Sequence, residues 1–189
     1  MVVYSWRIGS CAMTDATPAA EPPGHLTDPR DLLNGYLDYY RKALLRKLDG
    51  LSDEQLRTAT LPSGWTPLEL FKHLTYVEIR WLQWGFAGEP VERPWGDRGP
   101  GERTRDEPWH VPEDEGFEDI RAEFLATCER SREIVAGAPL DGVAPPGPRF
   151  PDGRPTSLIW ILFHLLQEYA RHLGHLDAAR ELIDGRTGA

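Results

Sequence analysis

The stretch from Thr156 to Ile183 has the longest helical periodicity in the chain, and Gly185 follows it in the position that commonly ends a helix. Three further stretches repeat apolar residues at three- and four-residue steps, over residues 29–50, about 66–85 and about 117–135. No strand pattern of consequence accompanies them. We therefore predict an all-α protein, with a four-helix bundle as its architecture.

Two capping patterns define the predicted helix starts. In Thr66-Pro67-Leu68-Glu69 the threonine can accept from an early amide while the glutamate reaches back, and proline occupies the first helical position. Ser52-Asp53-Glu54-Gln55 has the same logic and predicts a short helical turn between the first two long helices.

The chain begins with a segment that lacks helical periodicity. Residues 14–28 are rich in proline, alanine and acidic residues, which is typical of a flexible lead-in. We expect residues 1–27 to form a flexible N-terminal tail, with Met13 as the true start of the protein.

The helical domain is expected over residues 28–186, with long connections that cross the bundle. Residues 86–115 are dense in glycine, proline and charge, and a loop of this length is uncommon unless it is functional or mobile. Trp95, Trp109 and His110 within it indicate that the loop packs over another part of the molecule.

Composition excludes several classes of function. At 189 residues the chain suits one domain with a sizeable core. The net charge is -9 and the 21 basic residues are scattered, so we expect no nucleic-acid binding. No apolar run approaches the ~20 residues of a membrane span. With two cysteines, neither a disulfide framework nor a cysteine-based zinc site can form, and we expect a cytoplasmic protein.

The last predicted helix carries the residues that point to chemistry. On a wheel of about 100° per residue, His164, Glu168, His172 and His175 all fall within a sector of about 80°. Apolar residues share this sector, so it faces inward. A carboxylate and an imidazole four residues apart are costly to bury unless they pair with each other or bind a cation. Glu168 and His172 therefore form either a buried ion pair or half of a metal site.

His73 supplies the third candidate ligand. It lies on the apolar face of the helix at about 66–85, where a lone histidine can also be a core residue with one hydrogen bond. With Glu168 and His172 it would give three nitrogen and oxygen ligands and leave a fourth position for water or substrate, as in catalytic zinc sites. We predict a divalent metal site formed by these three residues.

Two segments resemble a known family: WTPLELFKHLTYVEIRWLQW and WILFHLLQEYARHLGHLDAARELIDG. Over about residues 28–186 the chain is similar to the DinB-like metal-binding four-helix bundle family, in the branch related to mycothiol-dependent maleylpyruvate isomerase and mycothiol S-transferases. This resemblance implies metal binding through His73, Glu168 and His172. Many relatives have three histidines, so Glu168 implies a more anionic, harder site. The expected metal is zinc, with nickel, iron or manganese as alternatives.

The resemblance also implies an activity. A divalent ion with an open position can bind a thiol and lower its pKa. The family would then make this protein an S-transferase or isomerase that uses a low-molecular-weight thiol such as mycothiol to attack an electrophilic small molecule. Dimers are frequent in the family, which implies a homodimer. The alternative is a non-catalytic metal- or ligand-binding stress-response protein of the same fold, in which His164 or His175 could close the fourth position.

Other residues could assist the site. Arg180 leans toward the apolar side of its helix and needs an anionic partner, which is either a salt bridge to the helix at 29–50 or 117–135, or an anionic ligand. We retain Arg180 as the candidate cofactor-binding residue. Groups that could orient the ligands or stack on a substrate, or that could be ordinary core residues, are Tyr76, Glu78, His164, Trp81 and Trp84.

Overall fold

The fold was analysed in a computed structural model, which describes residues 20–91, 95–96, 110–147, 149–150 and 156–187. Its elements, in chain order, are α1 (Pro29–Leu48), α2 (Asp53–Leu56), α3 (Pro67–Glu78), the π-helix η1 (Ile79–Phe86), α4 (Phe117–Gly137) and α5 (Leu158–Asp184). Among the described residues no strand forms, and only an isolated bridge joins Val143 and Ser157. The predicted all-α class is confirmed, and each predicted long helix is present.

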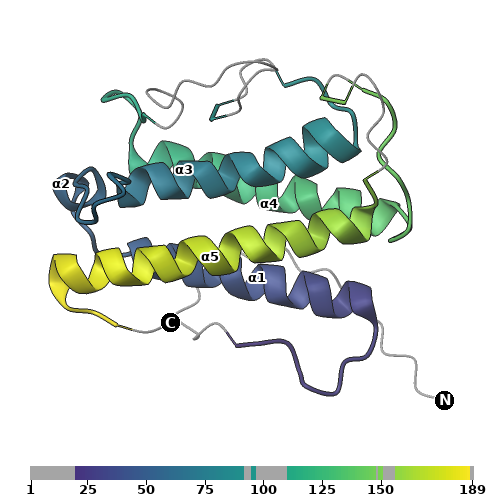
Figure 1. The fold of residues 1–189 in the computed structure, drawn as a ribbon, viewed down its shortest axis with the longest axis horizontal. Coiled ribbons are helices and arrows are strands. Elements are labelled where there is room, and N and C mark those ends of the chain that lie inside the picture. Colours follow the sequence, from purple (N-terminus) through teal and green to yellow (C-terminus); the bar gives the residue numbers. More distant parts are fainter. Residues whose placement is uncertain (1–19, 92–94, 97–109, 148, 151–155, 188–189) are drawn as a thin grey trace.

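The four long helices pack in two layers. Figure 1 shows α3 and α4 in one layer and α1 and α5 in the other, with α3 packed against both α4 and α5. The two helices of each layer run in the same direction, and the layers run in opposite directions. Because α3 and α4 are parallel neighbours, a tight turn cannot join them, and the connection before α4 is long, as predicted. The predicted long connection before α5 is also present, although it joins the antiparallel helices α4 and α5. None of the described helices is long and apolar enough to cross a membrane.

The predicted capping patterns form as expected. Thr66 Oγ1 accepts from the amide of Glu69, whose carboxylate accepts from the amide of Thr66. The same reciprocal pair joins Ser52 and Gln55 at the start of α2. At the other end of the chain Gly185 has a φ of 76°, the left-handed conformation that glycine adopts without steric cost after a helix. Local chemistry therefore determines these boundaries.

The end of the second long helix differs from the prediction. The expected α-helix stops at Glu78, and η1 continues it as a π-helix with a wider turn. π-helical segments are rare and often lie near functional sites. Gly85 permits the packing of this segment, because a Cβ there would lie 2.9 Å from the carbonyl oxygen of Arg80 and 3.2 Å from the Phe150 ring. A wheel of 100° per residue consequently does not describe the positions of Trp81 and Trp84.

A buried charged network ties three helices together. Arg41 of α1 donates to both carboxylate oxygens of Glu78, at 2.8 and 2.7 Å, and the Tyr169 hydroxyl donates to the same carboxylate. Burial disfavours ionisation of Glu78, but the charge and hydrogen bonds of Arg41 outweigh it and lower the pKa of the carboxyl. Glu78 therefore serves the core and does not orient a metal ligand.

Parts of the predicted tail and loop pack on the bundle. Pro22 lies so close to α1 that a Cβ on Gly35 would be 2.7 Å from its Cβ. Trp95 of the loop stacks beneath the Lys72 ammonium at 5.2 Å and accepts a hydrogen bond from Arg80 through its carbonyl oxygen. This confirms the predicted packing of the loop at Trp95. The expectations for residues 1–19 and for Trp109 lie outside the described residues.

Candidate metal centre

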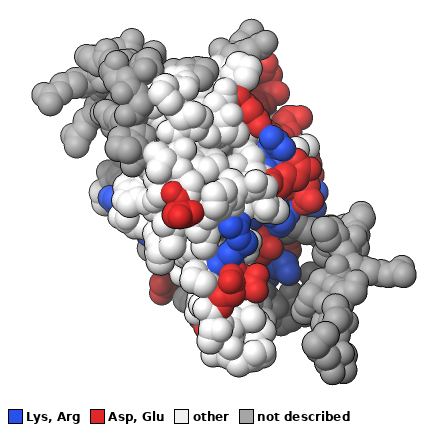
Figure 2. Space-filling model, turned by 90° about the vertical axis from the view of Figure 1, so that its right-hand side faces the viewer, with Lys and Arg blue, Asp and Glu red and all other residues white. Residues whose placement is uncertain are grey.

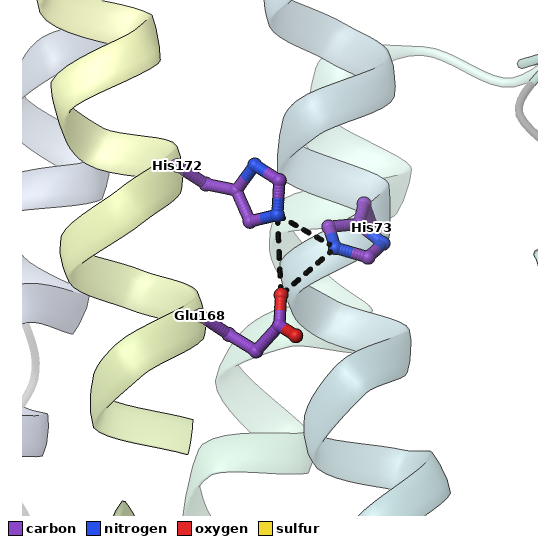
Figure 3. A group of neighbouring side chains, drawn as sticks. All are labelled: His73, Glu168 and His172. Carbon is purple, nitrogen blue, oxygen red and sulfur yellow. Dashed lines mark hydrogen bonds and ion pairs between the residues drawn. The ribbon is translucent and has the colours of Figure 1, made fainter. Parts of the chain in front are cut away.

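Three side chains from two helices point one atom each at a common centre. His73 comes from the middle of α3, and Glu168 and His172 come from successive turns of α5 (Figure 3). The two histidine Nε2 atoms lie 3.1 Å apart. Glu168 Oε2 lies 3.1 Å from Nε2 of His172 and 3.5 Å from Nε2 of His73.

The dimensions of this triangle fit a metal ion. Ligand atoms at about 2.0–2.1 Å from a tetrahedral zinc ion are separated by about 3.3 Å. The observed edges of 3.1, 3.1 and 3.5 Å lie close to that value. The donor set of two imidazoles and one carboxylate is also one that divalent zinc accepts. The residues present therefore fit a divalent cation.

Burial makes the group asymmetric. His73 and His172 are 6% and 8% exposed, whereas the Glu168 side chain retains 23% exposure. No further histidine, cysteine or carboxylate joins the three within the described part of the chain. A cation at the centre would thus have three protein ligands, of which the carboxylate is the most exposed to solvent.

The ionisation of the group suits metal binding. Burial is the main cause that lowers the pKa of His73 to about 4, against the opposing effect of its hydrogen bond with Glu168. Hydrogen bonds from His172 and then His73 lower the pKa of the Glu168 carboxyl. At neutral pH His73 is neutral and Glu168 is anionic, which are the protonation states that a metal ligand requires.

Trp65 packs on both histidine ligands. Its ring stacks on that of His172, with centroids 5.3 Å apart and planes 13° apart, and meets His73 edge to face at 5.5 Å. Sequence reasoning did not single out Trp65. Its position directly before the cap residue Thr66 was the available signal, because a hydrophobic residue there commonly packs back on the helix that follows.

The other two histidines of α5 lie beside the centre and do not complete it. His164 Nε2 is 3.4 Å from Glu168 Oε1, the oxygen that faces away from the two histidine ligands. His175 Nε2 lies 3.0 Å from the Ser63 hydroxyl. His164 can therefore orient the carboxylate, as the sequence suggested, whereas His175 contacts the loop before α3.

Arg180 lies away from the donor group. It donates to the carbonyl oxygens of Lys47 and Asp49 at the end of α1 and to the carboxylate of Asp184. Eight residues of helix separate it from His172, a rise of about 12 Å. The structure does not bring Arg180 to the donor group, and a contact with the thiol stays a prediction. Tyr76 likewise donates to Glu123 of α4.

The chain matches the sequence model of a known protein family. The sequence model of a family described as Mycothiol-S-transferase matches residues 32–185, a stretch that includes all three donor residues. This match confirms the predicted resemblance to the mycothiol-dependent branch. No curated protein matches the chain significantly.

Proposed function

We propose that this protein transfers a thiol, because the chain belongs to the mycothiol-S-transferase family. The protein would hold a divalent cation, zinc in the first instance and nickel, iron or manganese as alternatives, through His73, Glu168 and His172. It would join mycothiol or a similar low-molecular-weight thiol to an electrophilic small molecule. The observation that carries this proposal is the three-atom donor triangle, which matches tetrahedral spacing and has no fourth ligand among the described residues.

The chemistry needs few further groups. A bound divalent cation with an open coordination position would lower the pKa of a thiol that binds there and so provide thiolate near neutral pH. The single negative charge of Glu168 leaves a divalent centre net positive, which favours an anionic sulfur. His164 holds the second carboxylate oxygen, and Trp65 restricts both imidazole rings. In the transfer, the carbon–sulfur bond forms as the bond to the leaving group breaks, and the thiol proton passes to solvent.

Substitution of one ligand tests the centre. We expect purified parent protein to contain stoichiometric divalent metal and His172→Ala to lose it. The loss should exceed the roughly 10- to 100-fold weakening caused by removing a group that only supports a ligand. His175→Ala is the matched control, since it removes the same side chain from the same helix outside the donor group. Metal content is measured by plasma mass spectrometry. Equal metal content in parent and His172→Ala would contradict the assigned ligands.

Activity is tested with the same three proteins. Monochlorobimane becomes fluorescent when a thiol displaces its chloride, and we expect the metal-loaded parent and His175→Ala to accelerate its reaction with mycothiol. His172→Ala should not. Isothermal titration with mycothiol gives the thiol affinity separately. A parent protein that binds metal but neither binds nor transfers the thiol would contradict the transfer function and favour a metal-binding protein of the same fold.

A further inference from the structure

One side of the metal centre continues into an aromatic surface. This aromatic flank consists of His164, Trp160 and Trp81, and its member nearest the donor group, His164, lies one helical turn from Glu168 toward the start of α5. We propose that the aromatic flank binds the electrophilic substrate and selects electrophiles with a planar aromatic group next to the carbon that is attacked. This inference rests on the proposed thiol transfer and adds a substrate class to it.

The aromatic flank begins at the metal centre itself. His164 Nε2 lies 3.4 Å from the Oε1 atom of Glu168. The Trp160 ring lies parallel to His164, with centroids 5.2 Å apart and planes 7° apart, and Trp81 meets His164 edge to face at 4.6 Å. His164 is the ring beside the carboxylate, and Trp160 lies two helical turns from Glu168, a rise of about 12 Å. A substrate with its planar group on Trp160 must therefore extend along His164 for its reacting carbon to meet a sulfur held near Glu168.

The aromatic flank is exposed as well as close. Trp160 is 50% exposed, although removing the face of an indole ring from water is energetically favourable. Figure 2 looks at the end of the molecule where α5 begins, and most of the described surface in that view is neither acidic nor basic. Val143 and Phe163, at 53% and 59% exposure, belong to the small set of other large apolar side chains exposed in the described chain. An apolar ligand on Trp160 would remove exposed apolar surface from water.

Neighbouring groups hold the aromatic flank in place. The Arg149 guanidinium lies 5.3 Å from the Trp81 ring centroid and 5.1 Å from that of Trp84. The Phe150 ring lies 6.2 Å from Trp81. Cation–π contacts and ring packing of this kind restrict Trp81 before a ligand arrives, which lowers the entropic cost of binding. The π-helical turn of η1 positions Trp81 for these contacts.

A pair of chlorides tests the selectivity. Benzyl chloride and allyl chloride are both activated primary chlorides, and in both the thiolate forms a carbon–sulfur bond as chloride leaves with the bonding electrons. They differ in the aromatic ring. For metal-loaded Trp160→Ala with mycothiol, we expect kcat/KM for benzyl chloride to fall about three- to tenfold, with little change for allyl chloride and for the thiol KM. Trp160→Phe should restore most of the preference, since it returns an aromatic face.

Phe163→Ala is the matched control, because it removes an exposed aromatic side chain from the same helix, and the ring contacts of His164 among the described residues are with Trp81 and Trp160. It should leave the benzyl-to-allyl ratio unchanged. An equal fall for both chlorides in Trp160→Ala, a raised KM for the thiol, or the same loss in Phe163→Ala would overturn the inference while transfer stands. Transfer by the parent to monochlorobimane but to neither chloride would also overturn the inference alone. Absence of transfer to monochlorobimane and to both chlorides would overturn the proposed function, and the inference would fall with it.

Discussion

His73 shows how burial controls the state of a single ligand. Its side chain is almost fully buried between α3 and α5, and burial lowers its pKa to about 4. The free imidazole titrates near 6.5, so the unfolded chain binds a proton at this residue between pH 6.5 and 4 and the folded chain does not. The free energy of unfolding must therefore fall as the pH is lowered through this window. The lowered pKa of Glu168 adds a further loss below pH 4.5.

We predict that the metal-free protein loses about 1–2 kcal/mol of this free energy through His73 between pH 7 and pH 5. Urea unfolding in the presence of a chelator at the two pH values measures the change. His73→Gln cannot titrate and should show a smaller change by that amount. Identical pH dependence in the parent and His73→Gln would show that the proton equilibrium of His73 is not linked to folding.

At the scale of one element, η1 combines a close packing contact with the presentation of Trp81. Gly85 leaves room for Phe150, and Phe150 in turn packs on Trp81. Overpacking at a tight contact typically costs about 1–3 kcal/mol, because neighbouring backbone or rings must shift. The carbonyl oxygen of Arg80 is backbone and cannot move without changing the helix.

We predict that Gly85→Ala destabilises the protein by about 1–3 kcal/mol. Gly174→Ala is the control, since Gly174 lies in α5 with nothing within 4 Å of an added Cβ. That substitution should stabilise the protein by roughly 0.5–1 kcal/mol, because alanine has less freedom to lose in the unfolded chain. Urea unfolding of both variants checks the opposite signs, and a stabilising Gly85→Ala would refute the packing argument.

At the scale of the whole molecule, a bound cation would act as a cross-link. His73 and His172 are 99 residues apart in the sequence and belong to opposite layers of the bundle. A ligand that binds only the folded chain stabilises it by about 2.7 kcal/mol at a concentration 100 times its Kd. The unfolded chain cannot assemble the triangle, so the full effect applies to folding.

We expect zinc at that excess to raise the Tm by about 5–10 °C, and a chelator to reverse the rise. His172→Ala should show almost no response, whereas His175→Ala should respond like the parent. Calorimetry with and without zinc measures the shifts. A similar rise in His172→Ala would place the stabilising cation elsewhere.

The family was recognisable from the motifs in two of the helices, and local chemistry in the sequence determined the helices and part of the candidate site. Capping at Thr66 and Ser52 and the apolar periods predicted the elements, because both depend on residues three or four apart. The same spacing placed Glu168 and His172 on one face of α5. These features need no knowledge of distant contacts.

Tertiary structure alone decided the remaining features. The distance from His73 to the pair on α5 depends on how two helices far apart in sequence pack. The π-helical turn and the close approach of Gly85 to Phe150 are features that a helical wheel cannot represent. Arg180 donates to backbone carbonyl oxygens at the end of α1, because the last carbonyl groups of a helix have no partner within the helix. Periodicity reports which face of a helix is buried, whereas partners across the bundle depend on the packing of whole elements.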